Sequence, residues 1–133
     1  MLFSQAESDY LKTQRLARVA TASPKGVPEV SPVGFEFDGK YFWVGSHSQD
    51  IFSTSMRYRN ITSGNNRVSL VVDDLASVDP WRPRAIKVSG VAEIMEHNGM
   101  FGNGRYIRIS PRVTVSWGIE PSAGRQRVSK RWR

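Results

Sequence analysis

The stretch VSLVVDDLASVDPWRPRAIKVSG, residues 68–90, indicates the fold most directly. Its first apolar run ends at Asp73 and Asp74 and a second run closes the stretch, as expected for two strands joined by a solvated corner. In the corner, Trp81 lies between two prolines with Arg82 beside it, so a flat apolar side chain and a cation sit on a stiffened backbone. Such a loop suits two roles: clamping a planar anionic ligand by stacking and cation–π contact, or capping one end of a barrel.

Length and composition restrict the class of protein. A chain of 133 residues with 39% apolar residues is long enough for one globular domain with a modest core. No apolar run approaches the roughly 20 residues of a membrane helix. The start MLFSQAESDYLK lacks the basic and apolar regions of a secretory signal, and cysteine is absent. These features predict a cytoplasmic protein without disulfides.

The net charge of +7 is concentrated at one end of the chain. Residues 121–133, PSAGRQRVSKRWR, carry five basic side chains and no acid. We therefore expect a folded domain over residues 1–120 and a flexible basic tail over 121–133. Two other roles for the tail stay open: a lid over an acidic ligand, and a weak contact with nucleic-acid phosphates.

Turn and capping patterns predict a small antiparallel β-barrel with two short helices. Ser4 and Glu7 match a capping box that opens a helix over residues 5–14, and a second helix is expected over 48–61. Turn residues at 24–26 and 38–39 predict two tight hairpins, whereas glycines around residues 97–104 predict a loose connection. Six or seven strands are expected, over residues 18–23, 27–37, 41–45, 67–73, 85–95, 106–109 and 113–119.

Several kinds of active site have no match in the sequence. Neither phosphate-binding glycine motif occurs, and no Gly-x-Ser-x-Gly nucleophile elbow is present. His47 and His97 have no companion ligands at metal spacing, so no metal site is expected. If the protein is an enzyme, its reactive chemistry belongs to a bound cofactor that the chain positions.

Two segments favour an anionic cofactor. In the run Val-Gly-Ser-His-Ser, residues 44–48, a strand ends just before a helix, where free backbone N–H groups favour phosphate. On the expected helix, Ser53, Arg57 and Asn60 share one face by their spacing, while Arg59 points elsewhere. The alternative is an amphipathic helix with solvated arginines.

The sequence resembles the pyridoxamine 5′-phosphate oxidase-like split-barrel superfamily, and within it the reductases that use the deazaflavin coenzyme F420. The resemblance rests on the order and spacing of several segments across residues 16–120. These segments are LARVAT at 16–21, PEVSPVGFEF at 28–37, RYRN at 57–60, VSLVVDDL at 68–75, SVDPWRPRAIKVSG at 77–90 and ISPRVTVSWGIE at 109–120.

The resemblance implies a mainly β fold, a six-stranded antiparallel split β-barrel of Greek-key type with two short helices. It also implies a homodimer with cofactor sites in grooves along the interface. The second strand and the end of the third would run beside the ring of the cofactor, and Arg57 would hold its phosphate. Trp81 and Arg82 would come from the partner subunit to close the groove, with Trp117 close by. Spacing and resemblance together assign cofactor binding to Val30, Ser31, Pro32, Val33, Gly45, Ser46, His47, Arg57, Asn60, Trp81, Arg82 and Trp117.

The sequence departs from the family pattern at two places. Arg57 stands where relatives often have lysine, and Met56 stands at a position that is often basic. Residues 96–104, EHNGMFGNG, replace a longer helix of many relatives, which would leave the groove more open. An open basic groove suits the long anionic coenzyme F420 and is also compatible with FMN.

The leading hypothesis is an oxidoreductase that transfers a hydride from reduced coenzyme F420 to a small conjugated or heteroaromatic substrate. No side chain is expected to act as a nucleophile; Ser31 or a backbone N–H would orient the cofactor, and solvent could supply the proton. The alternatives are an FMN-dependent reductase, a pyridoxamine 5′-phosphate oxidase-like enzyme, and a cofactor-binding protein without turnover. Binding of single-stranded nucleic acid is disfavoured, because residues 1–120 carry only two of the seven excess positive charges.

Overall fold

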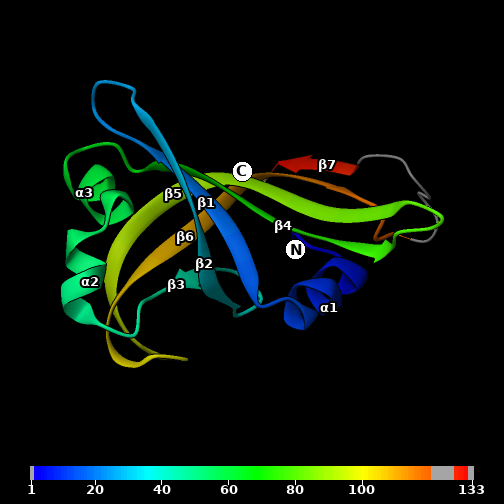
Figure 1. Cartoon of the computed structure of the whole chain (residues 1–133), viewed down its shortest axis with the longest axis horizontal. Helices are drawn as coiled ribbons and strands as arrows, with labels where there is room; N and C mark the ends of the chain where they lie inside the picture. Colours follow the sequence, from blue (N-terminus) through cyan, green and yellow to red (C-terminus); the bar gives the residue numbers. More distant parts are fainter. Residues whose placement is uncertain (1, 121–127, 132–133) are drawn as a thin grey trace.

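The computed structural model describes residues 2–120 and, for the backbone alone, residues 128–131 (Figure 1). Among these residues, no helix is long and apolar enough to cross a membrane. The helices and strands, in chain order, are α1 (Gln5–Thr13), β1 (Leu16–Ala22), β2 (Pro28–Phe37), β3 (Phe42–Val44), α2 (Gln49–Thr54), α3 (Met56–Thr62), β4 (Arg67–Ser77), β5 (Arg82–Gly99), β6 (Gly102–Trp117) and β7 (Val128–Arg131).

The strands form one antiparallel sheet that closes on itself. Their order is β3-β2-β1-β4-β5-β6-β7, and an additional pairing of β3 with β6 closes the first six strands into a barrel. Strands β1 to β3 follow one another as hairpins, and β4 then returns to lie beside β1, which is the Greek-key arrangement. The expected mainly β, six-stranded antiparallel barrel is therefore confirmed.

The core lies inside the barrel and follows from strand alternation. In β1 the side chains of Ala17, Val19 and Thr21 point inward, and the residues between them face out. Phe42 is fully buried and packs against Phe35 and Phe37, with ring centroids 6.0 and 4.8 Å away. Helix α1 covers this end of the barrel, and its expected capping box is present: the Ser4 hydroxyl accepts from the Glu7 N–H, and Glu7 accepts from the Ser4 N–H.

The prediction of a single helix over residues 48–61 is wrong in one respect, because the structure divides this segment into α2 and α3. Ser55 has extended backbone angles and belongs to neither helix. Its hydroxyl donates to the carbonyl of Phe52 at 2.8 Å and accepts from the N–H of Tyr58 at 3.3 Å, so one side chain ends α2 and begins α3. There are thus three short helices among the described residues.

The prediction of a loose connection over residues 97–104 is also wrong, because most of this segment is paired β-strand. Strands β5 and β6 pair up to Gly99 and Gly102, with only Met100 and Phe101 in the turn. The Tyr106 hydroxyl accepts from the Phe101 N–H at 3.0 Å and donates to the Gly102 carbonyl at 2.7 Å, which holds the turn closed.

Strand β6 is continuous where a break near residue 111 was expected. Pro111 has no N–H to offer the sheet, and it lies opposite Gly90 where the register shifts after Ser89. A Cβ on Gly90 would lie 2.3 Å from the carbonyl oxygen of Ser110, so only glycine permits this close approach. The bulge lets both strands pass the proline without ending.

The expectation of a separate basic tail falls mostly on residues 121–127 and 132–133, which lie outside the described residues. Within the tail, the backbone of β7 pairs antiparallel with β6 from Val113 to Ser116.

Candidate functional site

The expected cofactor residues fall into two regions of a single chain. One region consists of β2, the end of β3 and helix α3; the other lies where the β4–β5 hairpin meets the end of β6. Figure 1 shows α2 and α3 at one end of the long axis and the free end of the β4–β5 hairpin at the other. One subunit therefore does not bring all of these residues together.

The four expected residues of β2 divide between the two faces of the strand. Val30 and Pro32 face outward, and Val30 is 65% exposed. The side chains of Ser31 and Val33 point to the opposite, inner face of the strand, and Val33 is 5% exposed within the core. The side chains of Val30 and Pro32 are thus available to a ligand on the outer surface, whereas that of Val33 is used for packing.

Arg57 lies in the first turn of α3, where the Ser55 cap positions it. Its guanidinium is half-buried and its Nε atom has no hydrogen-bond partner. Burial lowers the pKa of Arg57, and the negative charge of Glu29 acts in the opposite direction. An arginine in this state favours an anionic ligand, because an anion would supply the missing hydrogen bonds.

Asn60 lies one turn further along α3 and has a structural contact. It is buried, and its Nδ2 donates to the Thr21 hydroxyl at 2.9 Å. This hydrogen bond fixes α3 against β1, and Arg57 is carried on the same helix. Ser53, which was expected to share a face with Arg57, belongs to α2 instead.

Glu29 was not predicted as a site residue. Its Oε2 atom is buried without a partner, as is the hydroxyl of Ser31 two positions later on the same side of β2. The sequence contains a signal that could have revealed Glu29. Along the inward-facing side of β2, the polar residues Glu29 and Ser31 precede the apolar Val33 and Phe35.

Gly45, Ser46 and His47 follow directly after β3. A Cβ on Gly45 would lie 2.5 Å from the Tyr106 ring and 2.9 Å from that of Phe101, so two aromatic side chains cover its backbone. His47 is exposed and meets Phe101 edge-on, with ring centroids 4.5 Å apart. Phe101, which sequence reasoning did not assign to the site, thus forms a wall beside the expected cofactor residues.

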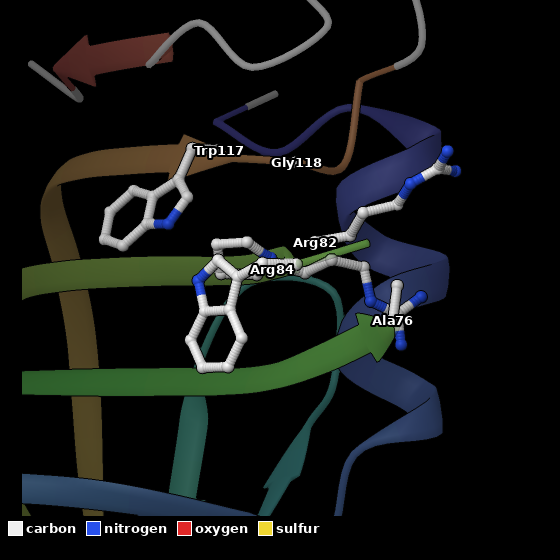
Figure 2. Close-up of a pocket in the computed structure, with 7 residues that line it drawn as sticks. Ala76, Arg82, Arg84, Trp117 and Gly118 are labelled. Atoms are coloured by element: carbon white, nitrogen blue, oxygen red, sulfur yellow. The ribbon is translucent and has the colours of Figure 1, made fainter. Parts of the chain in front are cut away.

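The second region is an open cavity of ≈ 640 Å³ lined by the β4–β5 hairpin and the end of β6. Trp81, Arg82 and Trp117 all line it, and Trp81 is 62% exposed. Figure 2 shows the Arg82 and Arg84 side chains extending toward helix α1, while the Trp117 indole points away from that helix. Among the described residues, Arg82 makes no ion pair, so its charge is available to a ligand or a partner.

Arg84, in contrast, is fully engaged. Its Nε and a terminal nitrogen donate to the two oxygens of Asp74 at 2.9 and 2.5 Å. The hydroxyl of Tyr10 donates to the same carboxylate at 3.0 Å, and the Arg84 guanidinium lies 4.9 Å from the Tyr10 ring centroid. Burial, followed by the contact with Asp74, raises the pKa of Tyr10, while the hydrogen bond from Arg84 holds the pKa of Asp74 below its ordinary value. This network joins α1 to the wall of the cavity.

The comparison with protein families decides the identity of the fold family. Residues 3–123 match the model of the family described as pyridoxamine 5′-phosphate oxidase. The chain belongs to this family. Over 124 residues it is 36% identical to the 5a,11a-dehydrotetracycline/5a,11a-dehydrooxytetracycline reductase of Streptomyces rimosus subsp. rimosus, covering 90% of this chain and 86% of the relative. Family and relative together support an oxidoreductase.

Solved structures at lower sequence identity share the fold. An F420 reductase superposes with a TM-score of 0.63 at 18% identity, covering 84% of this chain and 98% of that one. HutZ, the haem storage protein of Vibrio cholerae, superposes with a TM-score of 0.60 at 14% identity, covering 84% and 92%. Since such different proteins share the barrel, the fold does not by itself specify the cofactor.

Proposed function

We propose that this protein is a reductase that uses reduced coenzyme F420 as hydride donor to a small conjugated substrate. The observation that carries the proposal is the 36% identity, over nearly the whole chain, to a reductase of dehydrotetracyclines. The name of that substrate class denotes a carbon–carbon double bond in a fused ring system. Reduction of such a bond adds one hydride and one proton.

The residues of the first region fit a phosphate-bearing cofactor. Arg57 offers a half-buried guanidinium with an unsatisfied nitrogen, and Ser31 offers a buried hydroxyl without a partner. A phosphate would accept hydrogen bonds from the Arg57 guanidinium, which would remove the cost of leaving its Nε unpaired. The outward-facing Val30 and Pro32, together with Gly45, Ser46 and His47, would flank the ring.

A reduced deazaflavin supplies a hydride when it is bound, and the chain supplies position. Phe101 and Tyr106 cover Gly45 and limit the approach of solvent on that side. We assign no proton transfer to a side chain and propose that solvent provides the proton.

The proposal includes a homodimer. Trp81, Arg82 and Trp117 lie at the far end of the molecule from Arg57, so they reach the same cofactor only if a second copy supplies them. Exposed apolar side chains at Val27, Val30, Val78 and Trp81, each at least 62% exposed, are available for such an interface. Asn60 would act indirectly, by holding α3 in place.

The preference of the protein for coenzyme F420 or FMN is measured by titrating the purified protein with each cofactor. Quenching of tryptophan fluorescence reports the binding. We expect low-micromolar binding of F420 and weaker binding of FMN. The reverse preference would instead support an FMN-dependent reductase or an oxidase of the family type. Binding of F420 without oxidation of its reduced form by any conjugated cyclic ketone would identify a carrier rather than an enzyme.

The matched variants are Arg57→Gln and Arg59→Gln. Both remove one positive charge from α3, but Arg59 is exposed whereas Arg57 is half-buried. We expect Arg57→Gln to weaken F420 binding about tenfold or more and Arg59→Gln to change it little. Equal effects of the two variants would remove Arg57 from the phosphate site.

A further inference from the structure

Three polar atoms on β2 and α3 are buried without hydrogen-bond partners: Oε2 of Glu29, the hydroxyl of Ser31 and Nε of Arg57. Leaving such groups unpaired costs stability, so a buried cluster of them is uncommon away from binding sites. One member is an acid and one a base, although the site is proposed to bind an anion.

The fold connects Glu29 of β2 with Arg57 of α3 through Thr21 of β1. Glu29 pairs in register with Thr21 of β1. Thr21 accepts the hydrogen bond from Asn60, and Arg57 lies three residues before Asn60 on the same helix. Figure 1 shows α3 next to the β1–β2 hairpin, in agreement with these contacts.

The two charged side chains are close enough to interact and yet make no ion pair. No nitrogen–oxygen contact within 4.0 Å joins them, whereas Arg18, Arg84 and Arg108 do form such contacts with acids. The charge of Glu29 nonetheless acts on Arg57 and opposes the effect of its burial. Glu29 thus balances the charge of Arg57 without occupying its hydrogen-bonding groups.

We propose that Glu29 is a specificity-determining residue, which selects a cofactor whose phosphate carries one negative charge over a cofactor whose phosphate carries two. This inference rests on the proposed function, in which Arg57 holds the phosphate. A phosphomonoester carries about two charges at neutral pH, and a phosphodiester carries one. Beside an Arg57–Glu29 pair of zero net charge, the second charge of a monoester would meet the repulsion of Glu29.

The residues beside Arg57 on α3 add no buried cation. Met56 is neutral, and Arg59 is exposed on α3. Arg105 is directed to Tyr58, with a hydrogen bond of 3.0 Å to its hydroxyl and the guanidinium 5.5 Å from its ring centroid. The phosphate of F420 is a diester and that of FMN a monoester, so Glu29 favours F420.

The test uses three probes with the same ring: riboflavin, FMN, and FMN methylated on its phosphate to give a diester. For the unaltered protein we expect the methyl diester to bind more tightly than FMN. Glu29→Gln keeps the shape of the side chain and removes its charge; it should improve FMN binding roughly tenfold and change riboflavin binding little. Glu96→Gln, which removes an exposed acid of β5, should leave the ratio of FMN to diester unchanged.

Equal binding of FMN and its diester to the unaltered protein, or a Glu29→Gln variant that leaves their ratio unchanged, would overturn the inference and leave the proposed function intact. Failure of F420 and all three probes to bind would overturn the proposed function. In that case, thermal unfolding tests whether Glu29 and Arg57 interact without any ligand. The variants compared are Glu29→Gln, Arg57→Gln and the double variant. The double variant should lose less thermal stability than the two single losses added together, and strict additivity would contradict the balance.

Discussion

The indole of Trp43 and the imidazole of His97 stack face to face, with ring centroids 3.8 Å apart and planes inclined by 8°. Trp43 belongs to β3 and His97 to β5, so the stack joins two strands that do not pair in the sheet. The ring of Tyr106 also meets that of His97 edge-on, with centroids 5.0 Å apart. The end of the β5–β6 hairpin is thereby held against β3, beside the proposed cofactor site.

We expect His97→Ala to lower the free energy of unfolding by about 1–2 kcal/mol, because it removes both ring contacts. Chemical denaturation at neutral pH measures the loss. His47→Ala is the control, since His47 is exposed and meets only Phe101 edge-on. A loss for His97→Ala no greater than that for His47→Ala would show that the stack contributes little.

Gly45→Ala is expected to destabilise the protein by about 1–3 kcal/mol, because the added methyl group would overlap the Tyr106 ring. The matched variant is Gly34→Ala, whose Cβ would meet Phe101 at an ordinary 3.4 Å. Thermal unfolding of the two variants should separate them clearly. Similar melting temperatures would mean that Tyr106 and Phe101 move aside readily.

Asp74→Asn should destabilise the protein by about 1–2 kcal/mol at pH 7, because Asp74 accepts hydrogen bonds from Arg84, Tyr10 and Gln14. Since the hydrogen bond from Arg84 lowers the pKa of Asp74 in the folded state, this stabilisation is present above the pKa of an unfolded aspartate, about 3.9. It is lost as the pH falls through the lower folded pKa.

Denaturation of the Asp74→Asn variant and the unaltered protein at pH 7 and near pH 3 tests this expectation. The difference between them should narrow at the acidic pH. A constant difference at both values would assign the loss to packing rather than to the charge of Asp74.

Asn60→Ala should lower the free energy of unfolding by about 1–3 kcal/mol, because it leaves the Thr21 hydroxyl buried without its donor. It should also weaken cofactor binding, since α3 carries Arg57. Asn66→Ala, at an exposed position after the same helix, is the control for both measurements. Loss of stability with unchanged cofactor affinity would show that α3 does not depend on Asn60 for its position.

The local features of the chain were predictable from short-range chemistry. The Ser4–Glu7 capping box needs only residues three apart, and both of its hydrogen bonds form. The turn at Asp38 and Gly39 also forms as expected: Asp38 accepts from the N–H groups of Lys40 and Tyr41, and Gly39 takes a φ of 101°. Family membership was predictable as well, because it depends on the order of segments along the chain.

The features that failed prediction depend on side-chain contacts that the glycine and helix patterns do not reveal. The glycines near residue 100 predicted a loose connection between two strands. In the structure, hydrogen bonds to Tyr106 close the turn, and the stack of His97 on Trp43 holds the end of the hairpin in place. The helix is divided at Ser55 by the two hydrogen bonds of the Ser55 side chain. With this division, Phe52 of α2 and Ile61 of α3 are both buried in the core.

The sequence by itself determined most of the strands, the capping box of α1 and the two tight hairpins, because each follows from residues a few positions apart. It also predicts Arg57 as the residue that holds an anion. Only the tertiary structure decided that the charge of Glu29 acts on Arg57, that Phe101 covers Gly45, and that Trp81 and Arg82 lie at the opposite end of the molecule from Arg57. These relationships arise when the barrel closes, since strand pairing and helix packing bring together side chains whose distance in space is unrelated to their separation in the chain.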